Sequence, residues 1–375
     1  MQTLTMVHVA DLWLRMKMWI FFTSLWSGGL GITCLDAMGK SVDWYAIYKI
    51  PKISSSSNWI IKEGLAPFYL DVNSPSWTFL NQSMNDSQQP VYQTLTPIYK
   101  GKSQDLMYIV YNDEPPPSQV SLGNGGGHTK GVVAFDKNSG FWLIQSAPHF
   151  PPSDKYSYPQ TACHYGQSFL CVTFPYTQLG NVATQLWYNE PHIYNLNVPD
   201  SFIQDYPDLN KVIHGHTHPG SPYYSVLQMS SLGGEKFTSF AKSGEFGEDL
   251  YDGLVAPRLQ QDLLVETWLN GGGGKLDSNC STTYKVMKIN SISMQAFGLK
   301  FKETDDHSKW ATSTSVVGFR KEKVLKFQAL EKWTCIGDIN RMLSQFKRGG
   351  GTMCLQNPSV WQTYTSSVDS YDACK

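Results

Sequence analysis

The chain has 375 residues, enough for one large domain or two of ordinary size. Its formal net charge of -1 and isoelectric point of about 6.7 exclude a general basic field, so a nucleic-acid ligand would have to be held in a local cleft. Charged residues make up 16% and aromatic residues 13% of the chain, which is typical of a packed globular protein and excludes a disordered one.

The N-terminus predicts a secretory signal peptide over residues 1–31. Arg15 and Lys17 precede the apolar run 18–22, and small residues up to Gly31 follow. The run is too short to span a bilayer. A buried apolar helix is the alternative. We expect the mature chain to begin near Ile32.

Cysteines and sequons agree with the secretory pathway. No Cys-x-x-Cys pair occurs, which argues against a structural zinc site. The number of cysteines is odd, so at least one thiol is left unpaired within the monomer; they are Cys34, Cys163, Cys171, Cys280, Cys335, Cys354 and Cys374. The sequons predict N-glycosylation at Asn81, Asn85 and Asn279.

Short apolar and aromatic runs dominate the first half and predict strands. They are bounded by proline or turn residues and cover residues 42–48, 106–111, 131–135, 141–144 and 168–174. Residues 136–140 form the turn of a hairpin between two of these strands. The second half has fewer long strands. Helical spacing over 338–346 predicts a helix that stops before glycines 349–351, and glycines 271–274 predict a surface turn.

Strands mixed with helices predict the α/β or α+β class, with a central mixed sheet flanked by helices. We expect two similar halves, 32–205 and 206–375, with their boundary between about residues 195 and 220 and a site where the halves meet.

A His-x-Lys triplet occurs once in each half, as His128-Thr129-Lys130 and His307-Ser308-Lys309. In an extended strand residues i and i+2 point to the same face, so each triplet can present an imidazole beside an ammonium group. Two such pairs facing each other suit a phosphodiester: one histidine attacks phosphorus, the other protonates the leaving oxygen, and the lysines hold the anionic oxygens. The alternative is a chance arrangement of basic surface residues.

Many short sequence motifs, which follow one another in the family's order along the chain, resemble the deoxyribonuclease II family. They are Val42-Asp43-Trp44, Tyr111-Asn112-Asp113, Gly127 to Gly131, Gly140 to Leu143, Pro148 to Pro152, Tyr165-Gly166-Gln167, Phe246 to Tyr251, Asp306 to Trp310, and Trp333 through Thr352. The resemblance implies the fold of the phospholipase D superfamily, a single chain folded as a pseudodimer with one His-x-Lys in each half.

The resemblance also implies a function. Members of this family are acid endonucleases that hydrolyse DNA to 3′-phosphate ends without metal or other cofactor. They degrade DNA in lysosomes, including the DNA of apoptotic or engulfed cells. DNA is then the substrate, with no membrane span and no obligatory protein partner, and the location is lysosomal or secreted. Catalysis would rest on His128, Lys130, His307 and Lys309, through a phosphohistidine.

Acid chemistry also follows from the residues. Two lysines beside two histidines lower the pKa of both imidazoles, which moves the productive protonation state to low pH. We assign His128 as nucleophile and His307 as general acid, and the exchanged assignment stays open.

Two supporting polar residues are expected at Gln145 and Asn340. Relatives often have histidine at 145; glutamine can donate a hydrogen bond there but cannot transfer a proton. His149 is the residue that could replace it. Asn340 either orients polar groups or begins a helix.

The superfamily's usual aspartate, separated from the motif lysine by four residues, is absent. Phe135 stands there in the first half, and Asp136 comes one step late on the opposite face. The pairs therefore lack that histidine-orienting carboxylate, and Asp305 or Asp306 could replace it only with a different geometry.

The resemblance implies the disulfides as well. Relatives often have cysteine where Ala311 stands, which leaves Cys163 as the free thiol. The implied pairs are Cys34–Cys171, Cys280–Cys374 and Cys335–Cys354.

A rival interpretation starts from His214-Gly215-His216-Thr217-His218. Gly-His-Thr-His resembles a metal-binding element of calcineurin-like metallophosphoesterases. The aspartate and asparagine motifs that must precede it are missing, so a loop of pH-responsive charge, or a DNA-backbone contact in acid, is favoured. A secreted, non-catalytic nucleic-acid-binding glycoprotein is the remaining alternative.

Overall fold

The computed structural model describes residues 31–122, 126–215, 220–314 and 331–374. The predicted signal peptide lies outside these ranges except for Gly31. Within the described ranges, no helix is both long and apolar enough to cross a bilayer.

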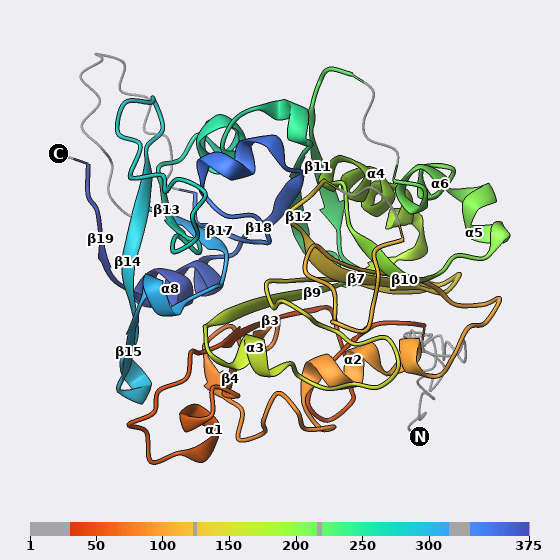
Figure 1. Cartoon of the computed structure of the whole chain (residues 1–375), viewed down its shortest axis with the longest axis horizontal. Helices are drawn as coiled ribbons and strands as arrows, with labels where there is room; N and C mark the ends of the chain where they lie inside the picture. Colours follow the sequence, from red (N-terminus) through yellow and green to blue (C-terminus); the bar gives the residue numbers. More distant parts are fainter. Residues whose placement is uncertain (1–30, 123–125, 216–219, 315–330, 375) are drawn as a thin grey trace, which may run out of the picture. The chain divides into compact units, whose positions relative to one another are not determined.

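Two large sheets form the body of the chain (Figure 1). The first, in spatial order, contains β10 (Ile193–Asn197), β6 (Met107–Asn112), β7 (Lys130–Phe135), β8 (Ser139–Gln145), β9 (Gln167–Pro175), β3 (Trp44–Lys49), β4 (Pro67–Asp71) and β5 (Thr78–Phe79). The second contains β11 (Tyr224–Ser230), β12 (Lys236–Lys242), β18 (Gly350–Gln356), β17 (Trp333–Gly337), β16 (Trp310–Ser313), β13 (Leu263–Glu266), β14 (Val286–Met294) and β15 (Leu299–Lys302), with β19 (Val368–Tyr371) paired to β14.

Short helices flank both sheets, and a small pair, β1 (Cys34–Leu35) and β2 (Ser41–Val42), lies beside the first. The α-helices are α1 (Trp59–Lys62), α2 (Pro90–Tyr99), α3 (Gln160–Cys163), α4 (Leu179–Asn189), α5 (Asp200–Asp205), α6 (Asp208–Ile213), α7 (Ala256–Leu259) and α8 (Pro358–Ser366). Other helical turns are η1 (Tyr176–Gln178), η2 (Gly244–Phe246), the π-helical η3 (Tyr251–Val255), η4 (Gln295–Phe297), η5 (Glu303–Asp305) and η6 (Leu343–Lys347). The chain is thus a mixed α/β protein with two sheet-bearing halves, as predicted.

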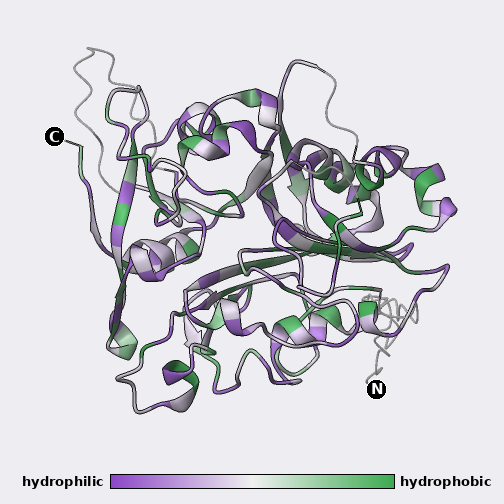
Figure 2. Ribbon diagram, viewed as in Figure 1, coloured by the Kyte–Doolittle hydropathy of each residue, from purple (hydrophilic) through white to green (hydrophobic). Residues whose placement is uncertain are grey.

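The central strands of the first sheet are mostly apolar because both of their faces are buried. On β3, Trp44, Ala46 and Tyr48 enter a core that also contains apolar residues of the second sheet and of α4 and α8. Tyr45 and Ile47 point the other way, into a core closed by α2. Figure 2 shows apolar and polar residues alternating along α2, as expected for a helix that covers a sheet with one side only.

The central five strands of the two sheets follow the same order. β6-β7-β8-β9-β3 in the first sheet corresponds to β13-β16-β17-β18-β12 in the second, and every neighbouring pair is antiparallel. The edges differ, since β10 pairs with β6 antiparallel whereas β14 pairs with β13 parallel. Lys130 begins β7 and Lys309 directly precedes β16, so the two His-x-Lys motifs occupy matching places.

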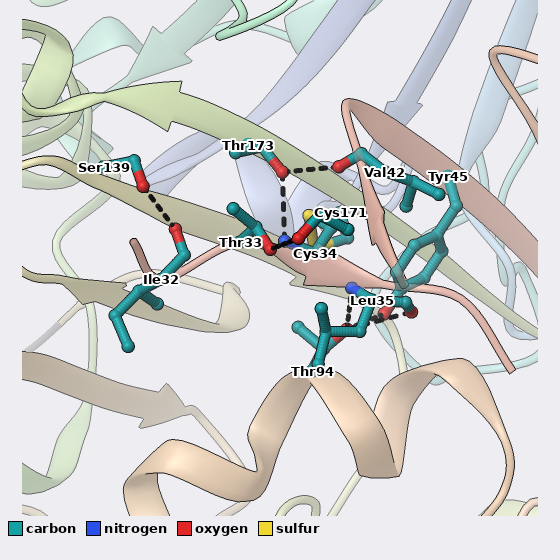
Figure 3. Close-up of a disulfide and its surroundings, with 11 residues drawn as sticks. Ile32, Thr33, Cys34, Leu35, Val42, Tyr45, Thr94, Ser139, Cys171 and Thr173 are labelled. Atoms are coloured by element: carbon teal, nitrogen blue, oxygen red, sulfur yellow. Dashed lines mark hydrogen bonds between the residues drawn. A yellow bond between two sulfur atoms is a disulfide. The ribbon is translucent and has the colours of Figure 1, made fainter. Parts of the chain in front are cut away.

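All three implied disulfides are present, and Cys163 is free and buried. The first attaches the start of the described chain to the first sheet (Figure 3). Beside it, Cys34 N donates to Thr173 Oγ1 at 3.0 Å, and Thr173 Oγ1 donates to Val42 O at 2.7 Å. A side chain of β9 therefore satisfies one backbone donor and one backbone acceptor of the small β1–β2 pair.

Asn81 and Asn85 are exposed, and Asn279 is half-buried. Their glycosylation remains a prediction.

The strand predictions of the first half are confirmed within two residues, but the predicted helix over 338–346 is wrong. After β17 the chain forms a loop that ends in the short turn η6. Asp338 accepts hydrogen bonds from Thr129 and from Gly351 N, and Asn340 donates to His128. These side-chain bonds compete with a helix. The second half does have fewer long strands among the described residues, as predicted. Its strands of six or more residues are β11, β12, β14 and β18, against β3, β6, β7, β8 and β9 in the first half.

The free thiol gives a direct test of the pairing. Cys163 is only 6% exposed, and burial raises the pKa of its thiol. A thiol reagent should therefore label it slowly in the native protein and stoichiometrically after unfolding without reductant. Cys163→Ser is the control and should show no label in either state. Peptide mapping that found Cys163 bridged to Cys34 or Cys171 would contradict the pairing.

Candidate active site

His128 is held by a carboxylate that the sequence analysis missed. Asn112, the last residue of β6, pairs with Lys130 on β7, so the next residue, Asp113, lies beside the motif. Asp113 Oδ2 is 2.7 Å from His128 Nδ1, and the Lys130 ammonium donates to Asp113 Oδ1. The Asp113 side chain is only 5% exposed. The motif thus has an orienting carboxylate, supplied by the neighbouring strand.

These contacts fix the tautomer of His128. A carboxylate can only accept, so Nδ1 must carry the proton and Nε2 then has the free lone pair. Asn340 Nδ2 lies 3.2 Å from Nε2 and can donate to it. Asn340 belongs to the second half and contacts His128, and its role as a supporting residue remains a prediction.

Arg348, also from the second half, completes the surroundings of His128. Its Nη2 donates to Asp113 Oδ2 at 3.1 Å and to Gly127 O at 2.7 Å. Its Nη1 lies 3.1 Å from His128 Nδ1, but that nitrogen already donates to Asp113, so we read the guanidinium as a partner of the carboxylate. Next to it, His128 N donates to Gly349 O at 2.8 Å.

Asp113 stays ionised in acid. Burial alone would raise the pKa of its carboxyl, but the adjacent His128, Lys130 and Arg348 outweigh burial and hold that pKa well below its usual range. The negative charge that orients His128 is therefore available at acid pH.

His307 has aromatic surroundings instead. Its ring stacks on Tyr165 with centroids 4.8 Å apart and planes 6° apart, and it meets the Trp268 ring edge-on at 3.9 Å. His307 N donates to Gly166 O at 2.9 Å, and the Lys309 ammonium donates to His307 O at 2.5 Å. His307 Nε2 is buried and has no hydrogen-bond partner among the described residues. That nitrogen is free to exchange a proton with a ligand.

The two motifs influence each other, which means that they share one site. Burial, then the charges of Lys309, Lys130 and His128, lowers the pKa of His307 to about 2. Burial lowers the pKa of His128 to about 4, where Asp113 opposes the decrease and both motif lysines add to it. Burial, then Lys130, lowers the pKa of Lys309 to about 7. The expectation that lysines depress both histidine pKa values is met, with burial as the larger cause.

The middle residue of each motif is fixed by buried hydroxyl and carboxyl groups. Thr129 donates to Asp338, and burial raises the pKa of Asp338 to about 6. Ser308 Oγ donates to Asp306 Oδ2 at 2.8 Å, and Tyr48 OH donates to the same carboxylate. Asp306 therefore fixes the backbone of the second motif, and its carboxylate is occupied away from the His307 ring.

Gln145 lies near the motif strands but its amide is used within its own loop. Its Nε2 donates to Phe150 O at 3.0 Å, and its Oε1 accepts from Ala147 N at 2.5 Å. His149 Nδ1 lies 2.8 Å from Pro115 O. The contacts of neither residue reach a motif histidine, so their place at the site remains a prediction.

The histidine-rich segment contributes little that can be described. His214 Nδ1 lies 2.8 Å from Asn210 O, while His216 and His218 lie outside the described residues. Among the residues that are described, no group of three or more His, Cys, Asp or Glu side chains is arranged to hold a metal ion.

Sequence reasoning missed four neighbours of the histidines: Asp113, Tyr165, Trp268 and Arg348. A signal existed for Asp113, because it follows a predicted strand next to the predicted hairpin. Tyr165 and Arg348 each belong to the half opposite to the histidine that they contact, and no local sequence pattern predicts that contact. His192 also lies near, because its carbonyl oxygen accepts from Asn112 N at 2.9 Å, next to Asp113, and burial lowers the pKa of its imidazole.

A mixed α/β chain that gathers two His–Lys pairs in one buried cationic site has the parts of a hydrolase for anionic esters. The chain belongs to the deoxyribonuclease II family, since the model of the family Deoxyribonuclease II matches residues 33–374. Plancitoxin-1 of Acanthaster planci is 38% identical over 92% of this chain and 92% of its own length. Deoxyribonuclease-2-alpha of Sus scrofa is 37% identical over 94% of this chain and 93% of its own. Deoxyribonuclease-2 of Caenorhabditis elegans is 38% identical over 89% of this chain and 92% of its own length.

Removing the charge of Asp113 tests its role. In Asp113→Asn the side chain keeps its shape, but it no longer favours the Nδ1–H tautomer or a positive imidazole. We expect kcat to fall by about 10²–10⁴-fold while KM changes by less than about threefold, as for a triad aspartate. Asp136→Asn, in the β7–β8 turn, is the control and should keep full activity. A kcat within about threefold of wild type in Asp113→Asn would show that orientation of His128 does not depend on this charge.

Proposed function

We propose that this protein is an acid endodeoxyribonuclease that hydrolyses DNA phosphodiester bonds without a metal ion and leaves 3′-phosphate ends. The observation that carries the proposal is the pairing of an oriented histidine, His128, with a second histidine, His307, whose buried Nε2 has no partner among the described residues. Two lysines lie with them in a member of the deoxyribonuclease II family.

The first step transfers the phosphoryl group to the protein. His128 Nε2 attacks phosphorus, the P–O5′ bond breaks, and His307 gives its proton to the departing 5′ oxygen. The products are a free 5′-hydroxyl end and a phosphohistidine that holds the upstream DNA fragment through its 3′ oxygen. Lys130 and Lys309 stabilise the charge on the phosphoryl oxygens, and Asn340, displaced from Nε2, can donate to one of them.

The second step restores the enzyme. His307, now neutral, takes a proton from water as the water oxygen attacks phosphorus, and the P–N bond to His128 breaks. The 3′-phosphate leaves, His307 is protonated again, and His128 returns to its neutral form. The two steps together consume one water molecule for each bond cleaved.

The surroundings of the two rings support this division of roles. A nucleophilic imidazole becomes positively charged when the P–N bond forms, and Asp113 lies at the Nδ1–H where that charge is best stabilised. His307 has no carboxylate contact among the described residues, so it holds its proton weakly and gives it up readily.

We also propose action in an acid compartment of the secretory pathway, the lysosome above all, or after secretion. Three disulfides agree with this pathway, and the names of relatives at 33% identity in Caenorhabditis elegans, Cell-death-related nuclease 7 and Cell death-related nuclease 6, fit degradation of the DNA of dying or engulfed cells.

Cleavage of plasmid DNA at acid pH in EDTA tests the proposal against its alternatives. Retained cleavage with 3′-phosphate ends supports it. Loss of cleavage in EDTA would indicate a metallophosphoesterase, and DNA binding without cleavage would indicate a non-catalytic binder.

Single alanine variants test the shared work of the two histidines. On DNA, His128→Ala and His307→Ala should each lower kcat by about 10³-fold or more, and the double variant should be hardly worse, because the groups act as a unit. On thymidine 3′-(p-nitrophenyl phosphate), whose leaving group needs no proton, His307→Ala should still release a burst of p-nitrophenol and accumulate the phosphohistidine. His128→Ala should give no burst. A burst from His128→Ala and none from His307→Ala would reverse the roles, whereas full activity of either variant on DNA would remove both from the mechanism.

The pH profile should show the effect of the substrate's charge. In the free protein the pKa of His307 is lowered to about 2, so its proton is lost as pH rises and kcat/KM should fall across the acid range. A bound phosphodiester adds negative charge, which favours the imidazolium and raises that pKa. The falling limb of kcat should therefore lie at higher pH than that of kcat/KM.

Stopped assays across pH at saturating and limiting DNA give both profiles. Glutamine at His214, His216 and His218 is the control, because loss of backbone contacts there would raise KM and leave kcat unchanged. A limb of kcat at the same pH as, or below, that of kcat/KM would contradict the assignment of His307.

A further inference from the structure

Two lysines outside the His-x-Lys motifs are completely buried, one in each half. Lys49 ends β3 and Lys242 ends β12, and both have 0% exposure. β3 lies next to β9, and β12 lies next to β18, so the two strands hold matching places in their sheets. The register agrees, because Lys49 pairs with Gln167 at the start of β9 and Lys242 pairs with Gly350 at the start of β18.

Both ammonium groups donate to backbone carbonyls of the loop that leads into the neighbouring strand. Lys49 Nζ donates to Cys163 O at 3.1 Å and to Tyr165 O. Lys242 Nζ donates to Phe346 O at 3.3 Å and to Arg348 O at 2.6 Å, and also to Gln345 O at 2.9 Å. Residues 163 and 346 each lie four positions before the strand residue that pairs with the lysine, Gln167 or Gly350. Residues 165 and 348 each lie two positions before it.

The two loops lie against the motif histidine of the opposite half. The loop of the first half contacts the second motif through His307 N, which donates to Gly166 O at 2.9 Å, and through the Tyr165 ring stacked on His307. The loop of the second half contacts the first motif through His128 N, which donates to Gly349 O at 2.8 Å, and through Arg348.

We propose that Lys49 and Lys242 are positioning residues, each of which holds the loop that places the motif histidine of the opposite half. The inference deepens the proposed nuclease function and rests on it. Neither lysine contacts the reacting groups. Each binds carbonyl oxygens that no other side chain is seen to bind in the described chain. The charge of Lys49 also contributes, after burial and nearer charges, to the lowered pKa of His307.

The charges around the lysines agree with this role. Cys163 and Asp306 face Lys49, and Asp249 and Glu190 face Lys242. Burial lowers the pKa of Lys49 to about 7 and that of Lys242 to about 8, so both remain protonated donors at acid pH.

Methionine preserves the length of the side chain and removes the donor. We expect Lys49→Met and Lys242→Met each to lower kcat on DNA by about 10²-fold with KM nearly unchanged, because a displaced catalytic group costs rate more than binding. Lys137→Met is the matched control: that ammonium also donates to a backbone carbonyl, Ser201 O at 3.1 Å, but in an exposed position, and its loss should leave kcat unchanged.

A second readout needs no activity. In protein labelled with ¹⁵N only at histidine, the amide of each histidine gives one signal whose hydrogen exchange can be followed. Lys49→Met should speed exchange at His307 and leave His128 protected, and Lys242→Met should do the reverse. Loss of charge alone would not open these backbone hydrogen bonds.

The outcomes separate the possibilities. The crossed exchange pattern with reduced kcat supports the proposal. Faster exchange at every histidine with a parallel loss of kcat, or unchanged exchange with kcat within about twofold of wild type, overturns it.

If a methionine variant yields no folded protein, the glutamine variant, which keeps two N–H donors, replaces it. Failure of both variants to fold assigns the lysine to folding and overturns the positioning role. If wild type does not cleave DNA, the nuclease proposal fails, yet the exchange pattern still decides whether the lysines hold the loops.

Discussion

Repulsion between buried positive charges is the constraint on which the site depends. Lys130 and Lys309 are each 2% exposed, and two histidines lie with them. Like charges repel more strongly in a buried site than in water, because the effective dielectric constant there is lower. Two features reduce this repulsion. Asp113 contacts Lys130, His128 and Arg348, and burial lowers the pKa of both histidines, which favours their neutral forms.

The same constraint prepares the site for an anion. Asp113 is the carboxylate that contacts His128, Lys130 and Arg348, and in the proposed function a bound phosphodiester adds further negative charge beside these cations. The repulsion that lowers the pKa values of Lys309 and His307 then turns into attraction, and the proton that His307 needs becomes easier to hold. In the proposed mechanism, substrate binding and acid catalysis are thus coupled through charge, without a conformational change.

How much of this could be predicted from sequence depends on whether a feature is local. The strands of the first half could be predicted, because residues buried on both faces of a sheet give long apolar runs. The His–Lys pairs follow from spacing, and the disulfides from resemblance. The prediction of a helix over 338–346 was wrong because the side chains of Asp338 and Asn340 form hydrogen bonds with groups that are distant in the sequence. Asp113 needed the pairing of β6 with β7, and Arg348 and Tyr165 needed the approach of the opposite half, which no local pattern encodes.

The matched strand order of the two sheets makes the difference between the histidines interpretable. Asn112 pairs with Lys130, and Glu266 pairs with Trp310; continuing both registers sets Asp113 opposite Thr129 and Trp268 opposite Ser308.

Trp268 therefore stands in the second half where Asp113 stands in the first, and Tyr165 stands where Arg348 does. His128 is surrounded by charged side chains and His307 by aromatic ones. Charged neighbours stabilise the positive charge of a phosphohistidine. Aromatic neighbours bury the imidazole and do not stabilise its positive charge by an ion pair, so the ring gives up its proton readily. In the proposed mechanism, two motifs that are identical in their chemistry have different roles because the fold places different residues around them.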